Sequence, residues 1–185
     1  MRLVIGITGA SGAILGIRTL ELLKALSVET HLVMSRWART TIAHETSYRV
    51  EQVEALASHV HHGDNQAAPI SSGSFRTDGM IIAPCSMKTL AAIRIGYSDT
   101  LICRAADVIL KERRKLVLVA RESPLSEIHL ENMLSLTRMG AVIFPPVPAF
   151  YSLPEKIDDM VNHMVGRVLD QFGLEAPDLR RWSGF

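Results

Sequence analysis

The segment 3–26 constrains the fold of this chain more than any other stretch of its sequence. It reads LVIGITGASGAILGIRTLELLKAL: an apolar run typical of a buried strand, a glycine-rich turn, and leucines at helical spacing. A helix that begins at such a turn has unpaired N–H groups, which together with the helix dipole attract phosphate. Gly9 and Gly12 would let a ligand approach the backbone, and Ser11 would add a hydroxyl. The same glycines would equally suit a turn that binds nothing, so both interpretations stay open.

The pattern of the turn and the end of the next strand argue against a dinucleotide site. Such a site needs Gly-x-Gly-x-x-Gly and an acidic residue roughly 20 residues later, at the end of the second strand. The turn has no Gly-x-Gly, and the expected second strand, 30–34, is followed by Ser35. The expected ligand is therefore a phosphate-bearing mononucleotide rather than NAD.

Length and composition restrict the class of protein. A chain of 185 residues fits one domain, 1–185, and a net charge of +1 gives no reason to expect nucleic acid or an anionic membrane. No apolar run approaches the roughly 18 residues of a membrane helix, and no secretory signal precedes the first strand. Cys85 and Cys103 do not form a C-x-x-C pair. We expect a cytoplasmic protein with reduced thiols, and the apolar excess favours a homo-oligomer.

Helical and strand patterns alternate along the whole chain. This alternation predicts a doubly wound, mostly parallel α/β sheet with helices on both faces, a Rossmann-like or flavodoxin-like three-layer sandwich. A capping box at 152–155 predicts the start of the last helix, and the tail that ends in Arg180, Arg181 and Trp182 is expected to dock on its own or a neighbouring subunit. Strands are expected at 3–7, 30–34, 79–83, 115–120 and 140–144, and helices at 13–26, 36–45, 50–59, 86–93, 98–113, 129–139 and 152–172.

His59, His61 and His62 form a histidine-rich run that could suggest a metal site. The run lies beside Gly63-Asp64-Asn65, a pattern typical of a solvated turn, and no second ligand cluster with zinc-like spacing is apparent elsewhere. We therefore expect no metal site there.

The carboxyl ends of the expected strands share one edge of the sheet, where ligands bind in this architecture. That edge would present hydroxyls, cations and one carboxylate, which suits a phosphorylated ligand and a single acid/base group. Arg104 and Lys111 are a heptad apart and share a helix face, either as a solvated basic stripe or as ligand contacts. Arg167 projects beside the apolar face of the last helix, where a partly buried guanidinium needs an anion.

At this point the motifs match a known family. The runs GITGASGA, HLVMS, ISSGSF, PCSMKTLAAI, RAADVILKERRKLVLV, RESPL, HLENML and PPVPAFY resemble the UbiX-type flavin prenyltransferases, including the branch long labelled phenolic or aromatic acid decarboxylase subunit. The resemblance extends nearly end to end. It implies a metal-independent enzyme that joins a dimethylallyl group from dimethylallyl monophosphate to N5 and C6 of reduced FMN. The product would pass to a UbiD-type decarboxylase, and the family tends to form dodecamers.

Position by position, the resemblance also implies roles for individual residues. Glu122 would be the acid/base group near the leaving phosphate, Ser11 and Glu45 would line the reacting centre, and Trp182 would close the pocket. The prenyl phosphate would contact Tyr151 and Arg167, together with Lys111 and Arg104 of a neighbouring subunit. FMN would contact Gly9, Ala10, Ser11, Ser35, Ser86, Met87, Lys88, Thr89 and Arg121.

Three rival functions can be stated from the sequence. The first is an FMN-dependent decarboxylase of cysteine-containing substrates, which is disfavoured because PVPAFY (146–151) stands where those enzymes have a Pro-x-Met-Asn-type segment. The second is direct decarboxylation of hydroxybenzoic acids, and the third is a flavin-carrying accessory subunit without activity. Cys85 precedes a helix start, where a thiolate is favoured. We assign it to packing because the family forms no covalent enzyme intermediate.

Overall fold

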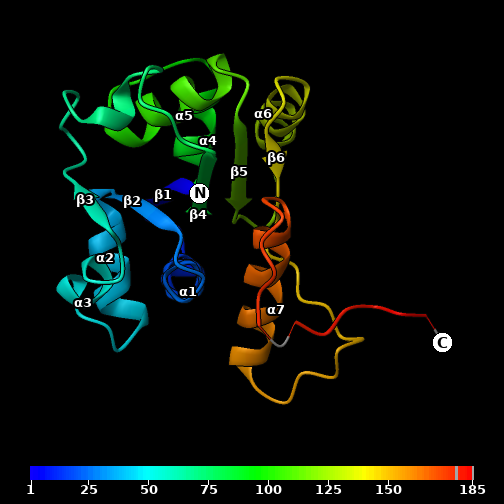
Figure 1. Ribbon diagram of the computed structural model, residues 1–185. Helices are drawn as coiled ribbons and strands as arrows, with labels where there is room; N and C mark the ends of the chain where they lie inside the picture. The colour runs from blue at the N-terminus through cyan, green and yellow to red at the C-terminus, as the bar shows by residue number, and fades with distance from the viewer. Residues whose placement is uncertain (178, 185) are drawn as a thin grey trace.

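A computed structural model describes residues 1–177 and 179–184. Its centre is a sheet of six strands, all paired in parallel, in the order β3-β2-β1-β4-β5-β6 (Figure 1). The order reverses direction between β1 and β4, which is the switch point where doubly wound folds bind ligands. The predicted fold class is confirmed. The strands are β1 (Arg2–Ile7), β2 (Glu29–Met34), β3 (His59–His61), β4 (Gly79–Cys85), β5 (Lys115–Ala120) and β6 (Val142–Ile143).

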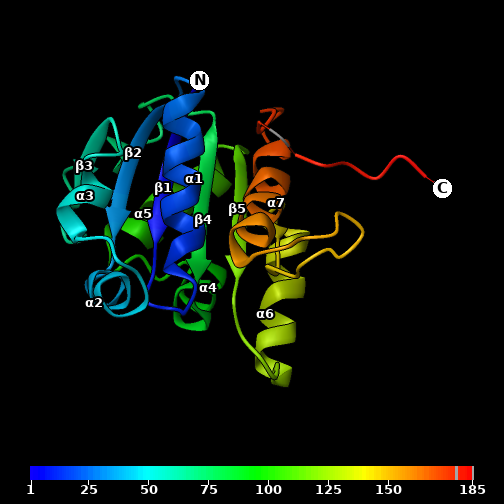
Figure 2. The ribbon, with the colours of Figure 1, turned by 90° about the horizontal axis from the view of Figure 1, so that it is seen from below.

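Helices cover both faces of this sheet. One core cluster joins α1, α2, α3 and α7 to one face, and a second joins α4, α5 and α6 to the other (Figure 1). Figure 2 shows α1 and α7 lying side by side along the first face. The helices are α1 (Ala13–Ala25), α2 (Arg36–Glu45), α3 (Val50–Glu54), α4 (Met87–Arg94), α5 (Leu101–Lys111), α6 (Glu127–Arg138) and α7 (Ile157–Asp170), with a short 3-10 turn at Pro69–Ser71.

The alternation of side chains along β1 explains the two cores. Leu3, Ile5 and Ile7 point into the α1 core, whereas Val4 points into the α5 core, and all of them are at most 1% exposed. Gly16 lets α1 lie directly on β4, because a Cβ there would be 2.3 Å from the Ala83 carbonyl oxygen. The first helix is thereby fixed against the strand whose end faces the switch point.

The segment 50–59 is not one helix, as predicted, but a short helix followed by an edge strand. Helix α3 ends at Glu54, and His59 pairs in parallel register with His31 of β2. The backbone groups in the second half of this segment form hydrogen bonds with β2, and a local helical pattern cannot reveal such partners.

Several other boundaries also differ from the predictions, and two of them have a clear physical reason. Strand β4 passes through Pro84 and ends at Cys85, with a register shift after Ile82 that accommodates a residue lacking an N–H group. The last helix begins at Ile157 rather than near Ser152. Leu153 has a φ of 50°, which interrupts a helix, and the carboxylate of Asp159 instead accepts the N–H groups at 155 and 156.

No helix in the described part of the chain is both long enough and apolar enough to cross a membrane.

Candidate active site

Thr8 joins the two loops that form the switch point. Its hydroxyl donates to the Pro84 carbonyl oxygen at 2.7 Å and accepts the Ser86 N–H group at 2.9 Å, and the residue is 1% exposed. The turn after β1 is therefore held against the start of α4. A buried hydroxyl with both partners satisfied fixes the separation of these loops.

Two serines cap the helices that begin at this edge, as the sequence predicted for one of them. The Ser35 hydroxyl oxygen accepts the Ala38 N–H group at 3.1 Å, and the Ser86 hydroxyl oxygen accepts the Thr89 N–H group at 3.3 Å. The Ser35 N–H group itself donates to the Ile7 carbonyl oxygen at 3.0 Å, which ties the start of α2 to the end of β1. Hydroxyls from two strand ends thus gather beside the glycine-rich turn, and Lys88 lies exposed in the first turn of α4.

Gly9 has a specific steric role in the turn. A Cβ atom on Gly9 would be 2.4 Å from the Cβ of Trp37, so only glycine allows the turn to pack against α2. Trp37 is 70% exposed, which leaves a large aromatic surface beside the turn. Flat ligands can pack against such a surface.

The N–H groups at the start of α1, which could have bound a phosphate, instead bind a carboxylate of the protein. Glu45 Oε2 accepts the N–H groups of Gly12 at 2.8 Å and Ala13 at 3.2 Å. Loss of hydration alone would raise the pKa of Glu45, but hydrogen bonds from Ser11, Gly12 and Ala13 and the charge of Arg121 together lower it. The turn therefore does attract an anion, but in this structure the anion belongs to the chain.

Arg121 and Glu122 follow β5 at the same edge, as predicted. The Arg121 N–H group donates to the Cys85 carbonyl oxygen at 3.2 Å, and its charge acts on Glu45, so the ends of β4 and β5 meet the α1 turn. Both side chains are exposed, and the Glu122 carboxylate accepts the N–H group of Ser123 at 3.0 Å. The predicted flavin-binding residues and the predicted acid/base group thus share one edge of a single chain.

Tyr151 and Trp182 meet in a second cluster, beside α7. The Tyr151 hydroxyl lies 2.9 Å from His163 Nε2, and the rings of Tyr151 and Trp182 have centroids 5.6 Å apart at 69°. His163 is 8% exposed; burial, followed by the nearby charge of Arg167, lowers its pKa. His163 was not predicted as a functional residue, because it lies on the buried face of α7 among apolar residues. A neutral His163 fixes the direction of the Tyr151 hydroxyl.

The expectation that Arg167 is partly buried was wrong, because the residue is exposed, and the anion that its guanidinium was expected to need is Asp170 of the same helix. Arg167 Nη1 donates to Asp170 Oδ2 at 2.6 Å, and its side chain is 46% exposed. Arg181 of the tail makes two further hydrogen bonds to Asp170, at 2.7 and 2.9 Å. Hydrogen bonds from Arg181 and then Arg167 lower the pKa of Asp170. The tail thus docks on α7 of its own chain.

Arg104 and Lys111 form a third cluster, on α5. Arg104 Nε donates to the Ser71 carbonyl oxygen at 3.1 Å, its Nη1 pairs with Asp107 at 2.7 Å, and Lys111 pairs with Glu112. Helices α5 and α7 cover opposite faces of the sheet (Figure 1). One chain therefore does not bring Arg104 and Lys111 together with Tyr151 and Arg167.

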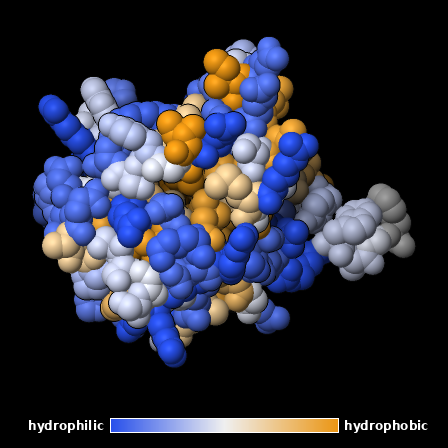
Figure 3. Space-filling view, turned by 90° about the horizontal axis from the view of Figure 1, so that it is seen from above, coloured by the Kyte–Doolittle hydropathy of each residue, from blue (hydrophilic) through white to orange (hydrophobic). Residues whose placement is uncertain are grey.

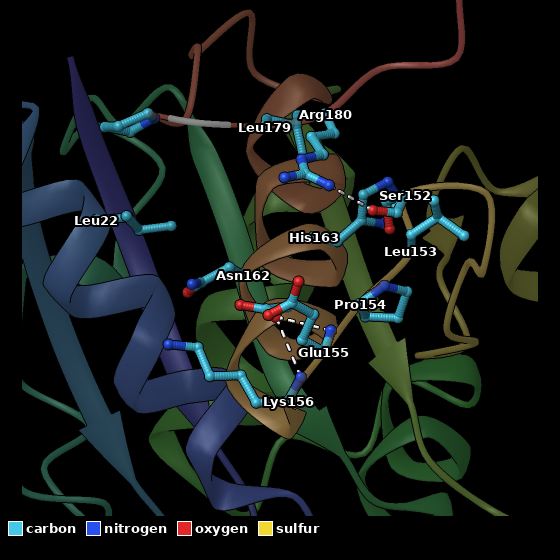
Figure 4. Close-up of a pocket in the computed structure, with 12 residues that line it drawn as sticks. Leu22, Ser152, Leu153, Pro154, Glu155, Lys156, Asn162, His163, Leu179 and Arg180 are labelled. Carbon is cyan, nitrogen blue, oxygen red and sulfur yellow. Dashed lines mark hydrogen bonds between the residues drawn. The ribbon is translucent and has the colours of Figure 1, made fainter.

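A cavity of about 560 Å³ lies between α1, the start of α7 and the tail (Figure 4). Arg180 closes one side by donating to the Ser152 carbonyl oxygen at 3.0 Å, and His163 lines the wall that backs onto Tyr151. None of the predicted flavin-binding residues lines it. The lining residues are Leu22, Ser152, Leu153, Pro154, Glu155, Lys156, Asp159, Asn162, His163, Pro177, Leu179 and Arg180.

Cys85 is fully buried at the end of β4, and burial raises the pKa of its thiol. A thiol in this state stays protonated near neutral pH and is a poor nucleophile. The structure thus agrees with a packing role.

The histidine-rich run has neighbours that its sequence context does not reveal. His31 of β2 lies between His59 and His61, and its Nδ1 is 2.9 Å from His61 Nε2. Its other ring nitrogen is 3.1 Å from Glu29 Oε1. A hydrogen bond from Arg2 and a second from His31 lower the pKa of Glu29 to about 2. The premise that no second group of ligand side chains accompanies this run was wrong, because parallel pairing of β2 and β3 supplies one. His62 is exposed and lies 3.8 Å from Asp64.

Comparison with known proteins identifies the family of this chain. Residues 1–169 match the family model described as Flavoprotein. A "Probable UbiX-like flavin prenyltransferase" from Streptomyces sp. (strain D7) is 65% identical over 185 residues, covering 100% of this chain and 92% of that protein.

Two solved structures have nearly the same fold. One is described as "AnUbiX (PadA1) in complex with FMN and dimethylallyl pyrophosphate"; it has a TM-score of 0.99 and 62% identity, and the match covers 100% of this chain and 98% of the other. The second, from Escherichia coli O157:H7, is described as a dodecameric FMN-dependent Ubix-like decarboxylase. Its TM-score is 0.98 at 64% identity, with 100% of both chains covered. The chain belongs to the UbiX-like flavin prenyltransferase family.

Proposed function

We propose that this protein transfers a dimethylallyl group from dimethylallyl monophosphate to reduced FMN, and that prenylated FMN is the product. The observation that carries the proposal is the carboxyl edge of the sheet, where hydroxyls, a cation, an exposed carboxylate and a close-packed glycine turn converge. Full-length similarity to a solved UbiX protein with FMN and a dimethylallyl ester supports the same chemistry.

The residues at this edge suit FMN. The hydroxyls of Ser35, Ser86 and Thr89 offer donors for phosphate and ribityl oxygens, and Lys88 and Arg121 offer positive charge. Because Glu45 already holds the N–H groups of the α1 turn, we place the FMN phosphate on the hydroxyls and cations instead. The backbone of the turn, including Gly9, Ala10 and Ser11, would face the isoalloxazine ring, as would the start of α4 at Met87.

Different side chains of the protein would have different roles in the transfer. Reduced FMN, when bound, would supply N5 and C6, and each of these atoms would bond to a different carbon of the dimethylallyl group. Breaking the allylic C–O bond leaves negative charge on the phosphate, which Arg167, the Tyr151 hydroxyl, Arg104 and Lys111 would stabilise. Glu122 is exposed at the flavin edge and can hold a proton that moves to the departing phosphate.

Glu45, Ser11 and Trp182 complete the reacting centre in this proposal. The ionised Glu45 would stabilise positive charge that spreads over the prenyl carbons, while the Ser11 hydroxyl keeps its carboxylate oriented. The exposed ring of Trp182, which lies against Tyr151, would cover the alkenyl group and exclude water.

The phosphate-binding residues point to a site shared between subunits. Tyr151 and Arg167 lie on one face of the sheet and Arg104 and Lys111 on the other, so one phosphate can contact both pairs only across a subunit boundary. Exposed hydrophobic residues on α6, among them Ile128, Leu130 and Leu134, supply surface for such contacts, and Figure 3 shows orange side chains gathered on that face. We propose a homo-oligomer, a dodecamer as in the Escherichia coli structure.

The product and the setting follow from the same proposal. Prenylated FMN would be handed to a UbiD-type decarboxylase that acts on aromatic or unsaturated acids. Both cysteines are free and buried, which fits a reducing compartment, and we propose a cytoplasmic location.

The decisive experiment is anaerobic incubation of the protein with reduced FMN and dimethylallyl monophosphate, followed by mass spectrometry of the extracted flavin. The proposal predicts a gain of one C5 unit. Unchanged flavin together with carbon dioxide released from a hydroxybenzoic acid would instead establish a decarboxylase, the activity by which the Escherichia coli structure is described. Unchanged flavin and no carbon dioxide would leave only an accessory role. The Glu51→Gln variant, at an exposed position of α3 outside the proposed site and the proposed subunit contacts, serves as the matched control for the Glu122→Gln variant.

A further inference from the structure

The amino end of the sheet carries a cluster of side chains that the prenyl transfer does not use. Glu29 is the first residue of β2, His31 lies two residues further on the same strand, and His59 begins β3 beside it. The flavin edge is formed by the opposite, carboxyl ends of the strands. The cluster is therefore separate from the proposed active site.

We propose that Glu29, His31 and His59 bind a divalent transition metal ion of the zinc type, which ties the edge strand β3 to β2. One potential ligand atom from each residue lies within 4.8 Å of the other two. Glu29 Oε1 is 3.1 Å from His31 Nε2 and 3.6 Å from His59 Nε2. Ligand atoms around a tetrahedral zinc ion are about 3.3 Å apart, so the carboxylate oxygen already lies at nearly the required distance from each imidazole nitrogen.

The surroundings of the three ligands fit a metal site. His61 Nε2 lies 2.9 Å from His31 Nδ1, which fixes the orientation of the buried ring, as second-shell partners of metal-bound histidines do. Arg2 Nε donates to Glu29 Oε1 at 2.8 Å and holds the carboxylate in place, while the second carboxylate oxygen and further lone pairs stay available for the ion.

Access and selectivity follow from the exposure and chemistry of the ligands. His59 has a side chain that is 55% exposed and can turn about its Cβ–Cγ bond, whereas His31 is only 5% exposed. The ion can enter from solvent and displace the hydrogen bond between His31 and Glu29, with water as a fourth ligand. Two imidazoles and one carboxylate favour Zn²⁺ over Mg²⁺ or Ca²⁺, which prefer oxygen ligands.

The test is calorimetric titration of Zn²⁺ into the untagged, metal-stripped full-length protein, with Mg²⁺ as the negative probe. We expect one Zn²⁺ per chain, a rise in the melting temperature, and at least tenfold weaker binding in the His59→Ala variant. His62→Ala is the matched control, because this neighbouring histidine is exposed and outside the cluster; it should bind Zn²⁺ as the wild type does.

Three results would overturn the proposal: no Zn²⁺ binding, unchanged affinity in His59→Ala, or an equal loss in His62→Ala. Since His59 is largely exposed, its replacement should leave the fold intact, and FMN titration of the same variant checks this. Co²⁺ absorption gives an independent view, because two nitrogen ligands and one oxygen ligand produce visible d–d bands that the His59→Ala variant should lose.

Discussion

Replacement of Glu45 by glutamine tests how the chain holds its own anion at the start of α1. The carboxylate accepts two backbone N–H groups, from Gly12 at 2.8 Å and from Ala13 at 3.2 Å, at the positive end of the helix dipole. Glutamine keeps an acceptor oxygen but loses the charge. Because Glu45 is exposed, solvent screening limits the cost to about 1 kcal/mol, or roughly 2–4 °C of melting temperature for a chain of this length.

The pH dependence has a definite sign. The folded pKa of Glu45 is lowered, so its stabilising contribution is fully present above the ordinary value of 4.5 and is lost as the pH falls through the folded pKa. The wild type should therefore have a higher melting temperature than the Glu45→Gln variant at pH 7. The difference between the two melting temperatures should shrink as the pH drops below 4.5.

The assay is differential scanning calorimetry of the flavin-free protein between pH 7 and the acid limit of reversible unfolding. Glu51→Gln, which removes an exposed carboxylate from α3, gives the background effect of one lost charge. The reasoning is refuted if the Glu45→Gln variant has the same melting temperature as the wild type at pH 7. It is also refuted if the melting temperature of the variant is lower than that of the wild type by the same amount at every pH.

Three further predictions concern the active site. His163→Phe removes the partner of the Tyr151 hydroxyl, 2.9 Å away, and should raise KM for dimethylallyl monophosphate several-fold in steady-state assays with FMN affinity unchanged; an unaltered KM would contradict the positioning role. Thr8→Val leaves the Ser86 N–H group and its loop without a buried partner, so thermal unfolding should show a loss of about 2 kcal/mol, with weaker FMN binding in fluorescence titration. Glu122→Gln should bind FMN normally but lose turnover, and loss of FMN binding would argue against an acid/base role.

The local parts of the fold were predictable from sequence where one physical signal dominated. Helix α2 has the predicted bounds because Ser35 caps it, and Ala38 and Ile42, four residues apart, face the core. Strand β5 was also predicted correctly, since an unbroken apolar run between polar residues suits a strand buried on both faces.

Errors arose where tertiary contacts override local preference. The capping box at 152–155 predicted a helix start, but Leu153 adopts a left-handed φ and the helix begins at Ile157. The strand β3 depends on backbone pairing with β2, which no local pattern encodes.

The site was predicted only in part, for the same reason. Sequence order placed Ser86 and Arg121 at one sheet edge, because the carboxyl ends of parallel strands coincide. It could not show that Glu45, from the far end of α2, returns to the α1 turn. The pairing of Arg167 with Asp170 was overlooked, although residues three apart on a helix are neighbours on its surface and the spacing could have indicated this ion pair.

Mixed oligomers test most directly the claim that the prenyl-phosphate site is built across subunits. Lys111→Ala and Arg167→Ala should each be nearly inactive alone, because each removes a positive charge from every site. In an equal mixture of the two chains, co-assembled by co-expression, about a quarter of the sites would draw both wild-type residues from different chains. The account predicts that the mixture forms prenylated flavin at about that fraction of the wild-type rate, as measured by flavin mass. If the mixture forms no more prenylated flavin than the single variants, one chain supplies both residues and the account is contradicted.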